Sequence, residues 1–208
     1  KVTSNGMKSL RTKAADAIAL PWEDIYDDYS TWLGVTAAKN PTDAWLYQEI
    51  IYTVKPNFIL ETGSFRGGGA LFLANMLDIC GIDGNVYSIE INPEGHFPYH
   101  PKISWITGDS ADPKIVQLVT AASRGKRGLV FLDSEHDAPH VIKEMRSYWP
   151  IVGKGSYLIV EDTWHLPGQG GPYDAVEKFL KENINFEIDE SMHRFAVSNN
   201  PRGFLKRK

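Results

Sequence analysis

The sequence predicts an α/β protein with a mostly parallel sheet that is covered by helices on both faces. Short apolar runs typical of buried strands alternate with apolar patterns of helical period, beginning at residue 58. An acidic residue ends or follows each of the first five of these strands, and a glycine cluster separates the first strand from the next helix. Ligands of open α/β sheets bind at the carboxyl ends of the strands, so these acids and glycines mark the expected site.

Length and charge narrow the class of protein further. The 208 residues suit one domain with a substantial core. The net charge of −4 gives no electrostatic reason to expect nucleic acid or an anionic membrane as the partner. The single cysteine, Cys80, excludes a disulfide within the chain, and no apolar run approaches the ~20 residues that a membrane span needs. We therefore expect a soluble, cytoplasmic protein.

The first 40 residues are assigned to an N-terminal helical segment or lid, and residues 41–208 to the main domain. Aromatic and apolar side chains recur there at three- and four-residue spacing, at Trp22, Tyr26, Tyr29, Trp32 and Leu33. This spacing predicts a helix that packs its stripe on the core, with a substrate lid as the alternative. The pair Asn40-Pro41 then signals the start of a helix, predicted over 44–54.

Strands and helices alternate through the main domain. The predicted strands are 58–61, 86–91, 103–107, 129–132 and 157–160, and the predicted helices between them are 70–79, 115–122 and 137–149. A last helix begins at Pro172, and 186–188 and 194–197 are predicted to form a closing pair of strands. The basic end, 202–208, is interpreted as a solvated tail.

The loop after the first strand favours a cofactor without phosphate. It has no Gly-x-Gly-x-x-Gly pattern, because Phe65 stands where a dinucleotide pyrophosphate needs a second glycine. Glu61 before the loop suits an ammonium group, and Glu90 at the end of the second strand can accept both hydroxyls of a ribose. Asp109 and Ser110 can meet an adenine edge. An amino group, a ribose and an adenine together describe S-adenosylmethionine (SAM). The residues expected to bind it are Glu61, Gly63, Ser64, Gly67, Glu90, Asp109 and Ser110.

A second group of acids follows the fourth and fifth strands. Asp133, Glu161 and Asp162 are expected to converge beside the cofactor, because these strands are neighbours in such a sheet. Carboxylate oxygens suit Mg²⁺ or a similar divalent cation, which could hold a substrate hydroxyl and lower its pKa. The plainer alternatives are a glycine loop that only serves packing and acids that are merely solvated.

Histidines supply the candidates for a general base. His136 follows Asp133 by three residues, and we expect it to take the proton from a substrate hydroxyl, with Asp133 as its catalytic neighbour. His165 follows Asp162 at the same spacing and is the weaker candidate.

Three motifs resemble the cephalosporin hydroxylase / rhamnosyl O-methyltransferase family. They are Ile59-Leu60-Glu61-Thr62-Gly63-Ser64, Phe131-Leu132-Asp133-Ser134-Glu135-His136 and Leu158-Ile159-Val160-Glu161-Asp162-Thr163, and the ending Asn200-Pro201-Arg202-Gly203-Phe204-Leu205-Lys206 is also similar. The resemblance covers about Pro41 to the C-terminus. It implies a Rossmann-like class I methyltransferase domain at 41–208, a three-layer sandwich around a seven-stranded, mostly parallel sheet with a C-terminal antiparallel hairpin strand. It also implies Mg²⁺ at Asp133, Glu161 and Asp162.

The function expected from this resemblance is SAM-dependent methyl transfer to a hydroxyl of a sugar or small natural product. The enzyme alternatives are an NAD-dependent oxidoreductase or a small-molecule hydroxylase on the same fold, and the non-enzymatic alternative is a degenerate binding or scaffold module. The acceptor and the oligomeric state, including a homo-oligomer, stay open.

Overall fold

The computed structural model describes residues 30–164, 167–195 and 197–208. Two short strands, β1 (Thr31–Trp32) and β2 (Val35–Thr36), form a hairpin before the main domain. The main sheet contains β3 (Phe58–Thr62), β4 (Asn85–Glu90), β5 (Ile103–Thr107), β6 (Gly128–Leu132), β7 (Tyr157–Val160), β8 (Phe186–Ile188) and β9 (Phe204–Arg207). The helices are α2 (Pro41–Val54), α3 (Gly68–Ile79), α4 (Pro113–Ala122), α5 (Ala138–Tyr148) and α6 (Pro172–Glu182), with short 3₁₀ turns η1 (Trp149–Ile151) and η2 (Glu190–His193).

The seven strands lie in the order β5-β4-β3-β6-β7-β9-β8. The neighbours from β5 to β7 pair in parallel, whereas β9 is antiparallel to both β7 and β8. The chain enters the sheet at β3 and adds β4 and β5 on one side. It then returns to add β6 on the other side of β3, so the direction of the strand order reverses between β3 and β6. This reversal leaves a crevice at the carboxyl ends of β3, β4 and β6, where ligands bind in open α/β sheets.

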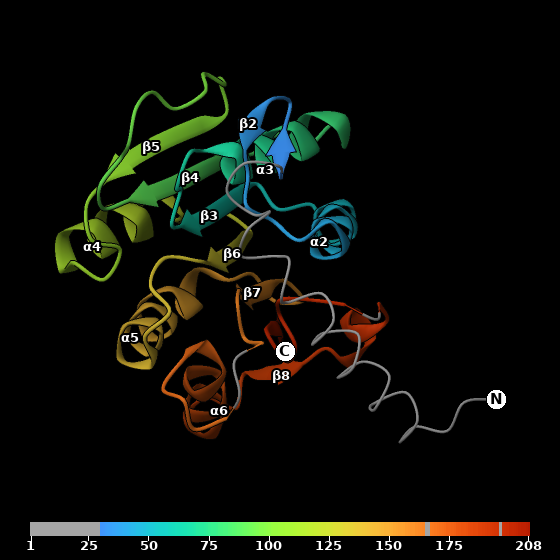
Figure 1. Cartoon of the computed structure of the whole chain (residues 1–208), viewed down its shortest axis with the longest axis vertical. Coiled ribbons are helices and arrows are strands. Elements are labelled where there is room, and N and C mark those ends of the chain that lie inside the picture. The colour runs from blue at the N-terminus through green and yellow to red at the C-terminus, as the bar shows by residue number, and fades with distance from the viewer. Residues whose placement is uncertain (1–29, 165–166, 196) are drawn as a thin grey trace.

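Helices cover both faces of this sheet, and the strand residues alternate between two hydrophobic cores. Ile59, Phe131 and Ile159 pack with α2 and α3 on one face. Residues one position away, such as Leu60 and Val130, pack with α5 and α6 on the other face. Figure 1 shows the sheet between these two layers of helices. The predicted three-layer α/β fold with a C-terminal antiparallel strand is confirmed.

Two helix starts are explained by their capping residues. The side chain of Asn40 accepts a hydrogen bond from the N–H of Thr42, and Pro41 occupies the first turn of α2, so this helix starts three residues before the predicted one. Asp112 caps α4 in the same way, with Pro113 following it.

Within the described segments, no helix combines the length and the apolar character that crossing a membrane requires.

The prediction of a helical stripe at Trp22–Leu33 is wrong for its described part. Trp32 and Leu33 lie in the β1–β2 hairpin, where Gly34 has a φ of +81° and allows the turn; residues 22–29 lie outside the described residues. Trp32 still packs on the core, because its ring meets Phe72 edge to face at a centroid distance of 5.0 Å.

Two predictions about the C-terminal residues are also wrong. The closing strand is β9 at 204–207 rather than 194–197, of which residues 194, 195 and 197 lie outside any strand. The basic end is therefore not a solvated tail. Phe204 and Leu205 are fully buried between β7 and β8, while Lys206 and Arg207 are half-buried.

Candidate active site

The loop between β3 and α3 is pressed against the end of β6. Gly63 has a φ of +81°, and a Cβ atom there would lie 1.8 Å from the backbone oxygen of Asp133, so only glycine fits. Phe65 also has a positive φ, +50°, and its N–H donates to the Glu90 carboxylate at 2.9 Å. Glu90 thereby fixes the loop from the end of β4. Gly67 packs against Pro98 and Trp105 and lines neither of the cavities described next.

Two adjoining cavities follow this loop and share Gly63, Glu90 and Ser134 in their walls. The smaller one, about 190 Å³, is also lined by Gly108, Asp109, Ser110 and His140. The larger one, about 390 Å³, is also lined by Lys39, Glu61, Ser64, Phe65, Gly69, Asp133, His136 and Asp162. Of the residues predicted to bind the cofactor, Glu61, Gly63, Ser64, Glu90, Asp109 and Ser110 line one or both cavities.

Glu61 is a buried acid in the wall of the larger cavity. It is 1% exposed, and the Ser88 hydroxyl donates to it at 2.5 Å. Burial raises its pKa to about 7, while the positive charge of Lys39 and the hydrogen bond from Ser88 act in the opposite direction. A buried carboxylate in a cavity wall is a suitable partner for the ammonium group of a ligand.

The smaller cavity rests on a hydrogen-bonded group of polar side chains. The hydroxyls of Ser110 and Ser134 both donate to Glu144 Oε1, at 2.6 and 2.8 Å. Glu144 is fully buried, and its other carboxylate oxygen has no hydrogen-bond partner among the described residues. His140 lies 3.6 Å from the same carboxylate. The Ser110 hydroxyl is therefore already engaged, whereas its neighbour Asp109 keeps a carboxylate at the cavity wall.

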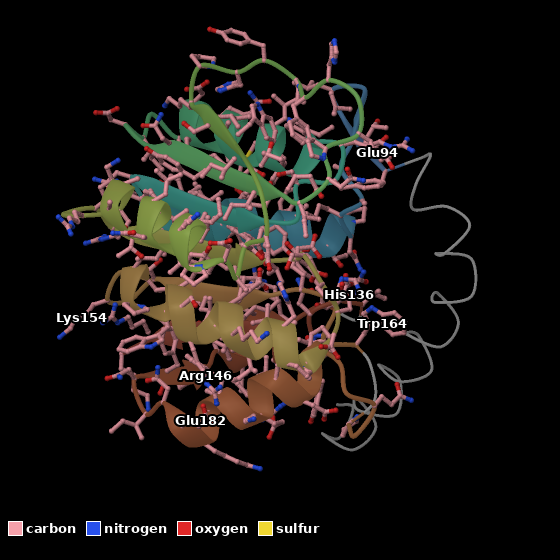
Figure 2. All side chains as sticks on the ribbon, turned by 90° about the vertical axis from the view of Figure 1, so that its left-hand side faces the viewer. Glu94, His136, Arg146, Lys154, Trp164 and Glu182 are labelled. Carbon is pink, nitrogen blue, oxygen red and sulfur yellow. The ribbon has the colours of Figure 1, made fainter. Side chains whose placement is uncertain are left out.

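The predicted catalytic group meets at the ends of β6 and β7. One ligand atom from each of Asp133, His136 and Asp162 lies within 4.8 Å of the others. His136 Nε2 lies 3.2 Å from Asp162 Oδ2 and 3.8 Å from Asp133 Oδ1. Figure 2 shows His136 and Trp164 on the same side of the molecule. His165, the weaker candidate for a base, lies outside the described residues.

Asp162 reaches the cluster through a strained backbone conformation that its neighbours support. Its φ is +53°, and its N–H donates to the side-chain oxygen of Asn200 at 2.9 Å. The amide of Asn199 donates to Asp162 Oδ1 at 3.3 Å. Asp43, at the start of α2, binds the same segment by accepting hydrogen bonds from the Ser198 hydroxyl and the Asn199 N–H at 2.6 and 2.7 Å. These residues lie far apart in the sequence, and no local pattern indicates their role.

The feature that the sequence reasoning missed entirely is Lys39. Its ammonium donates to Asp133 Oδ2 and, at 2.9 Å, to Glu161 Oε1. Its side chain is only 10% exposed. The structure thus brings Glu161 against Lys39, on the other side of Asp133 from His136 and Asp162. Glu161 and Asp162 follow the end of β7, and they separate because Asp162 takes a left-handed backbone conformation with a φ of +53°.

These contacts set the protonation of the cluster. Burial alone would raise the pKa of Asp133, but the charge of Lys39 and the contact with His136 bring it below its ordinary value. Burial and the charge of Asp133 raise the pKa of Glu161 well above its ordinary value, against the effect of Lys39. Asp133 and then Asp162 raise the pKa of His136 to about 10, so its imidazole is protonated at neutral pH.

The residues of the cluster fit a divalent cation. Carboxylate oxygens of Asp133 and Asp162 face one side, and the imidazole nitrogen of His136 stands close to both. Hard oxygen donors suit Mg²⁺, and imidazole nitrogen suits Mn²⁺ or other transition metals as well.

Residues 24–208 match the family model described as rhamnosyl O-methyltransferase/CmcI. The rhamnosyl O-methyltransferase of Mycobacterium leprae (strain TN) is 35% identical over 191 residues, which cover 86% of this chain and 83% of that protein. The chain belongs to the rhamnosyl O-methyltransferase/CmcI family. The rhamnosyl O-methyltransferase of Mycobacterium tuberculosis (strain ATCC 25618 / H37Rv) is 32% identical over 213 residues, covering 94% of this chain and 87% of that protein.

Solved structures agree on the fold. A structure of CmcI with Mg and SAM has a TM-score of 0.67 at 21% identity, covering 86% of this chain and 76% of that one. The O-methyltransferase NovP has a TM-score of 0.61 at 14% identity, covering 99% of this chain and 98% of that one. Membership of the family identifies the chain as a SAM-dependent O-methyltransferase and decides against the oxidoreductase and scaffold alternatives.

Proposed function

We propose that the protein is a metal-assisted O-methyltransferase that acts on a hydroxyl group of a rhamnosyl or related sugar. The observation that carries this proposal is the meeting of Asp133, His136 and Asp162 at the larger cavity, whose wall also contains Glu61 and residues of the glycine loop. The proposed donor-binding residues and the acid–histidine cluster thus line one cavity of about 390 Å³.

Glu61 and Glu90 would anchor the two polar ends of the donor. The Glu61 carboxylate is buried and suits the ammonium group of the methionine portion. Glu90 already accepts hydrogen bonds from the N–H groups of Phe65 and Asn92, at 2.9 and 3.1 Å, and its position suits ribose hydroxyls. Asp109 at the smaller cavity suits the adenine amino group. When bound, the donor would supply an electrophilic methyl group.

Asp133 and Asp162 would hold the divalent cation, with His136 beside them and Glu161 as a further ligand. When bound there, the cation supplies Lewis acidity that lowers the pKa of an acceptor hydroxyl. The CmcI structure with Mg and SAM, from a member of the same family, supports this pairing of metal and donor.

His136 would act as the general base. Without metal, Asp133 and Asp162 stabilise the protonated form of the His136 imidazole. The pKa of His136 must therefore fall, so that the ring loses this proton and can accept the proton of the acceptor hydroxyl. A divalent charge at these two carboxylates has that effect, because it removes the groups that stabilise the imidazolium. The imidazole of His136, which lines the larger cavity, would then be available as a neutral base for the acceptor hydroxyl.

The acceptor class is supported by the relatives and by the cavity wall. The mycobacterial relatives are named rhamnosyl O-methyltransferases, and a relative from Streptomyces olivaceus is named as a 3'-O-methyltransferase of a methoxy-rhamnosyl tetracenomycin. Phe65 lines the larger cavity with 40% of its residue surface exposed. An exposed aromatic ring beside the acids offers an apolar surface for the face of a sugar ring.

The test is transfer of a labelled methyl group from SAM, with Mg²⁺ present, to a set of acceptors: a rhamnoside, a glucoside and a catechol. We expect the rhamnoside to gain one methyl group on oxygen, with the position read by mass spectrometry and NMR. His136→Gln should slow the transfer by about 10²-fold or more while leaving donor binding intact. Methylation of the catechol alone, or an unchanged rate in His136→Gln, would contradict the proposal.

A further inference from the structure

Lys39 is held in place by the chain on both sides of it. The Ser30 hydroxyl donates to the Lys39 carbonyl at 3.0 Å, and the Ala37 N–H donates to the Ser30 carbonyl at 2.8 Å. Directly after Lys39, Asn40 caps helix α2. The hairpin before it lies against the first turn of α3, where a Cβ on Gly68 would come within 2.3 Å of the Thr36 carbonyl. The position of this lysine is therefore built into the fold.

The side chain of Lys39 lies between acids. Besides its contacts with Asp133 and Glu161, its Cε lies near Gly69, where a Cβ would meet both Lys39 Cε at 3.1 Å and Glu61 Oε1 at 2.4 Å. The absence of a side chain at Gly69 thus makes room for the lysine and for Glu61. Among the described residues that line the larger cavity, Lys39 is the one lysine or arginine.

The contacts of Lys39 overlap with the expected metal ligands. Its ammonium takes Asp133 Oδ2 and Glu161 Oε1, while Asp133 Oδ1 faces His136. Asp133 and Glu161 are two of the three acids expected to bind the cation. A divalent cation that engages Glu161 or both oxygens of Asp133 must share them with the ammonium or displace it.

We propose that Lys39 is a built-in counter-ion of this acid cluster and that its ammonium competes with the divalent cation for Asp133 and Glu161. This inference rests on the metal site of the proposed function. Without metal, the ammonium offsets the repulsion between the carboxylates and keeps them in place. A lysine suits exchange because its charge sits on a flexible four-carbon stem and is readily rehydrated. The Lys39 ammonium thereby lowers the affinity of the site for the divalent cation.

The test measures the binding of Mn²⁺ directly, from the loss of the free-ion EPR signal, without donor or acceptor. Lys39→Met removes the competing charge and keeps the apolar stem. We expect it to bind Mn²⁺ at least about tenfold tighter than the unaltered protein, since a unit charge a few ångström away changes cation affinity by that order. Lys39→Arg keeps the charge and should stay within about threefold of the unaltered protein.

Lys154→Met is the matched control. Lys154 is exposed, and Figure 2 shows it at the opposite end of the molecule from His136, so its replacement should leave Mn²⁺ binding unchanged. Equal or weaker Mn²⁺ binding in Lys39→Met overturns the inference. If neither the unaltered protein nor any variant binds Mn²⁺, the inference and the metal site both fall, and methyl transfer measured in EDTA then decides whether the transferase function survives without them.

Thermal unfolding gives a second test, which can be made even if Lys39→Met is less stable than the unaltered protein. Lys39→Met leaves Asp133 and Glu161 without their cation, so it should melt below the unaltered protein in EDTA and recover most of the difference in Mn²⁺. The rise in Tm caused by Mn²⁺ should thus be larger in Lys39→Met than in the unaltered protein. An equal or smaller rise contradicts competition.

Discussion

Donor binding should depend on pH through Glu61. The pKa of this carboxyl is about 7 because the residue is buried. The free protein therefore holds a proton on Glu61 below that pH, and the ammonium of the donor needs the ionised form. Because the pKa is raised above its ordinary value, affinity should increase as the pH rises through 7 and level off above it. The experiment compares the affinity for S-adenosylhomocysteine at about pH 8 with the affinity at about pH 6.

The magnitude follows from the position of the pKa. One pH unit below it, ionising Glu61 costs about 1.4 kcal/mol, which weakens binding about tenfold. Isothermal titration calorimetry at several pH values measures this directly. Other charged groups face the same space, namely Lys39, Asp133 and Glu90, so the effect must be assigned to Glu61 with a variant.

Glu61→Gln supplies that assignment. The amide keeps the shape of the side chain and removes the charge, so its affinity should be nearly flat across this pH range and about tenfold or more weaker at pH 8. Glu187→Gln, on the edge strand β8, is the matched control and should behave like the unaltered protein. A flat profile in the unaltered protein, or the same slope in Glu61→Gln, would refute the assignment of Glu61 to the donor ammonium.

Three further predictions test the geometry of the site. NMR of the His136 ring without metal should show an imidazolium that persists to about pH 9, and Mg²⁺ should lower its pKa by about one unit or more; titration near the ordinary value without metal would count against the cluster. Gly63→Ala should destabilise the protein to urea by more than about 3 kcal/mol, whereas Gly155→Ala, with the same sign of φ but open space around it, should cost about 1 kcal/mol. Asn200→Ala should weaken Mn²⁺ binding and cost about 2 kcal/mol of stability, because it removes the support of the Asp162 backbone; unchanged Mn²⁺ affinity would show that this support is dispensable.

Most of the sheet was predictable because its strands are buried on both faces. A run such as Leu129–Leu132 is continuously apolar, and the acid that follows it has to be at the sheet edge. The site residues at these ends were predictable for the same reason: Glu61, Glu90, Asp109, Asp133 and Asp162 all line the cavities. Neighbouring parallel strands bring their carboxyl ends together whatever the loops do.

Other elements could not be predicted from local patterns. The strands β1 and β2 have two residues each, too few to show a period. Strand β9 has two apolar residues followed by two basic residues at the end of the chain, and their charge suggested solvent, whereas they pair with β7 and β8. A lysine before a helix carries no sign that it will reach acids 94 and 122 residues further along the chain. Only the packing of the hairpin on α3 brings Lys39 there.

The role of Glu161 as a metal ligand stays a prediction, and its contact with Lys39 makes it testable together with the metal itself. The pairing Glu161-Asp162 suggested two ligands from one strand end, whereas the structure directs Asp162 to His136 and Glu161 to Lys39. Local sequence identifies the acids and does not fix which way each side chain turns.

The central claim is tested most directly by the rate of methyl transfer to a rhamnoside in Asp133→Asn, with S-adenosylhomocysteine affinity measured on the same preparation. Asp133 lies where the proposed cation site, His136 and the larger cavity meet. The account predicts that this variant, and the unaltered protein in EDTA, lose transfer by about 10³-fold or more while binding S-adenosylhomocysteine nearly as before. Unchanged transfer in both would contradict metal-assisted chemistry at Asp133.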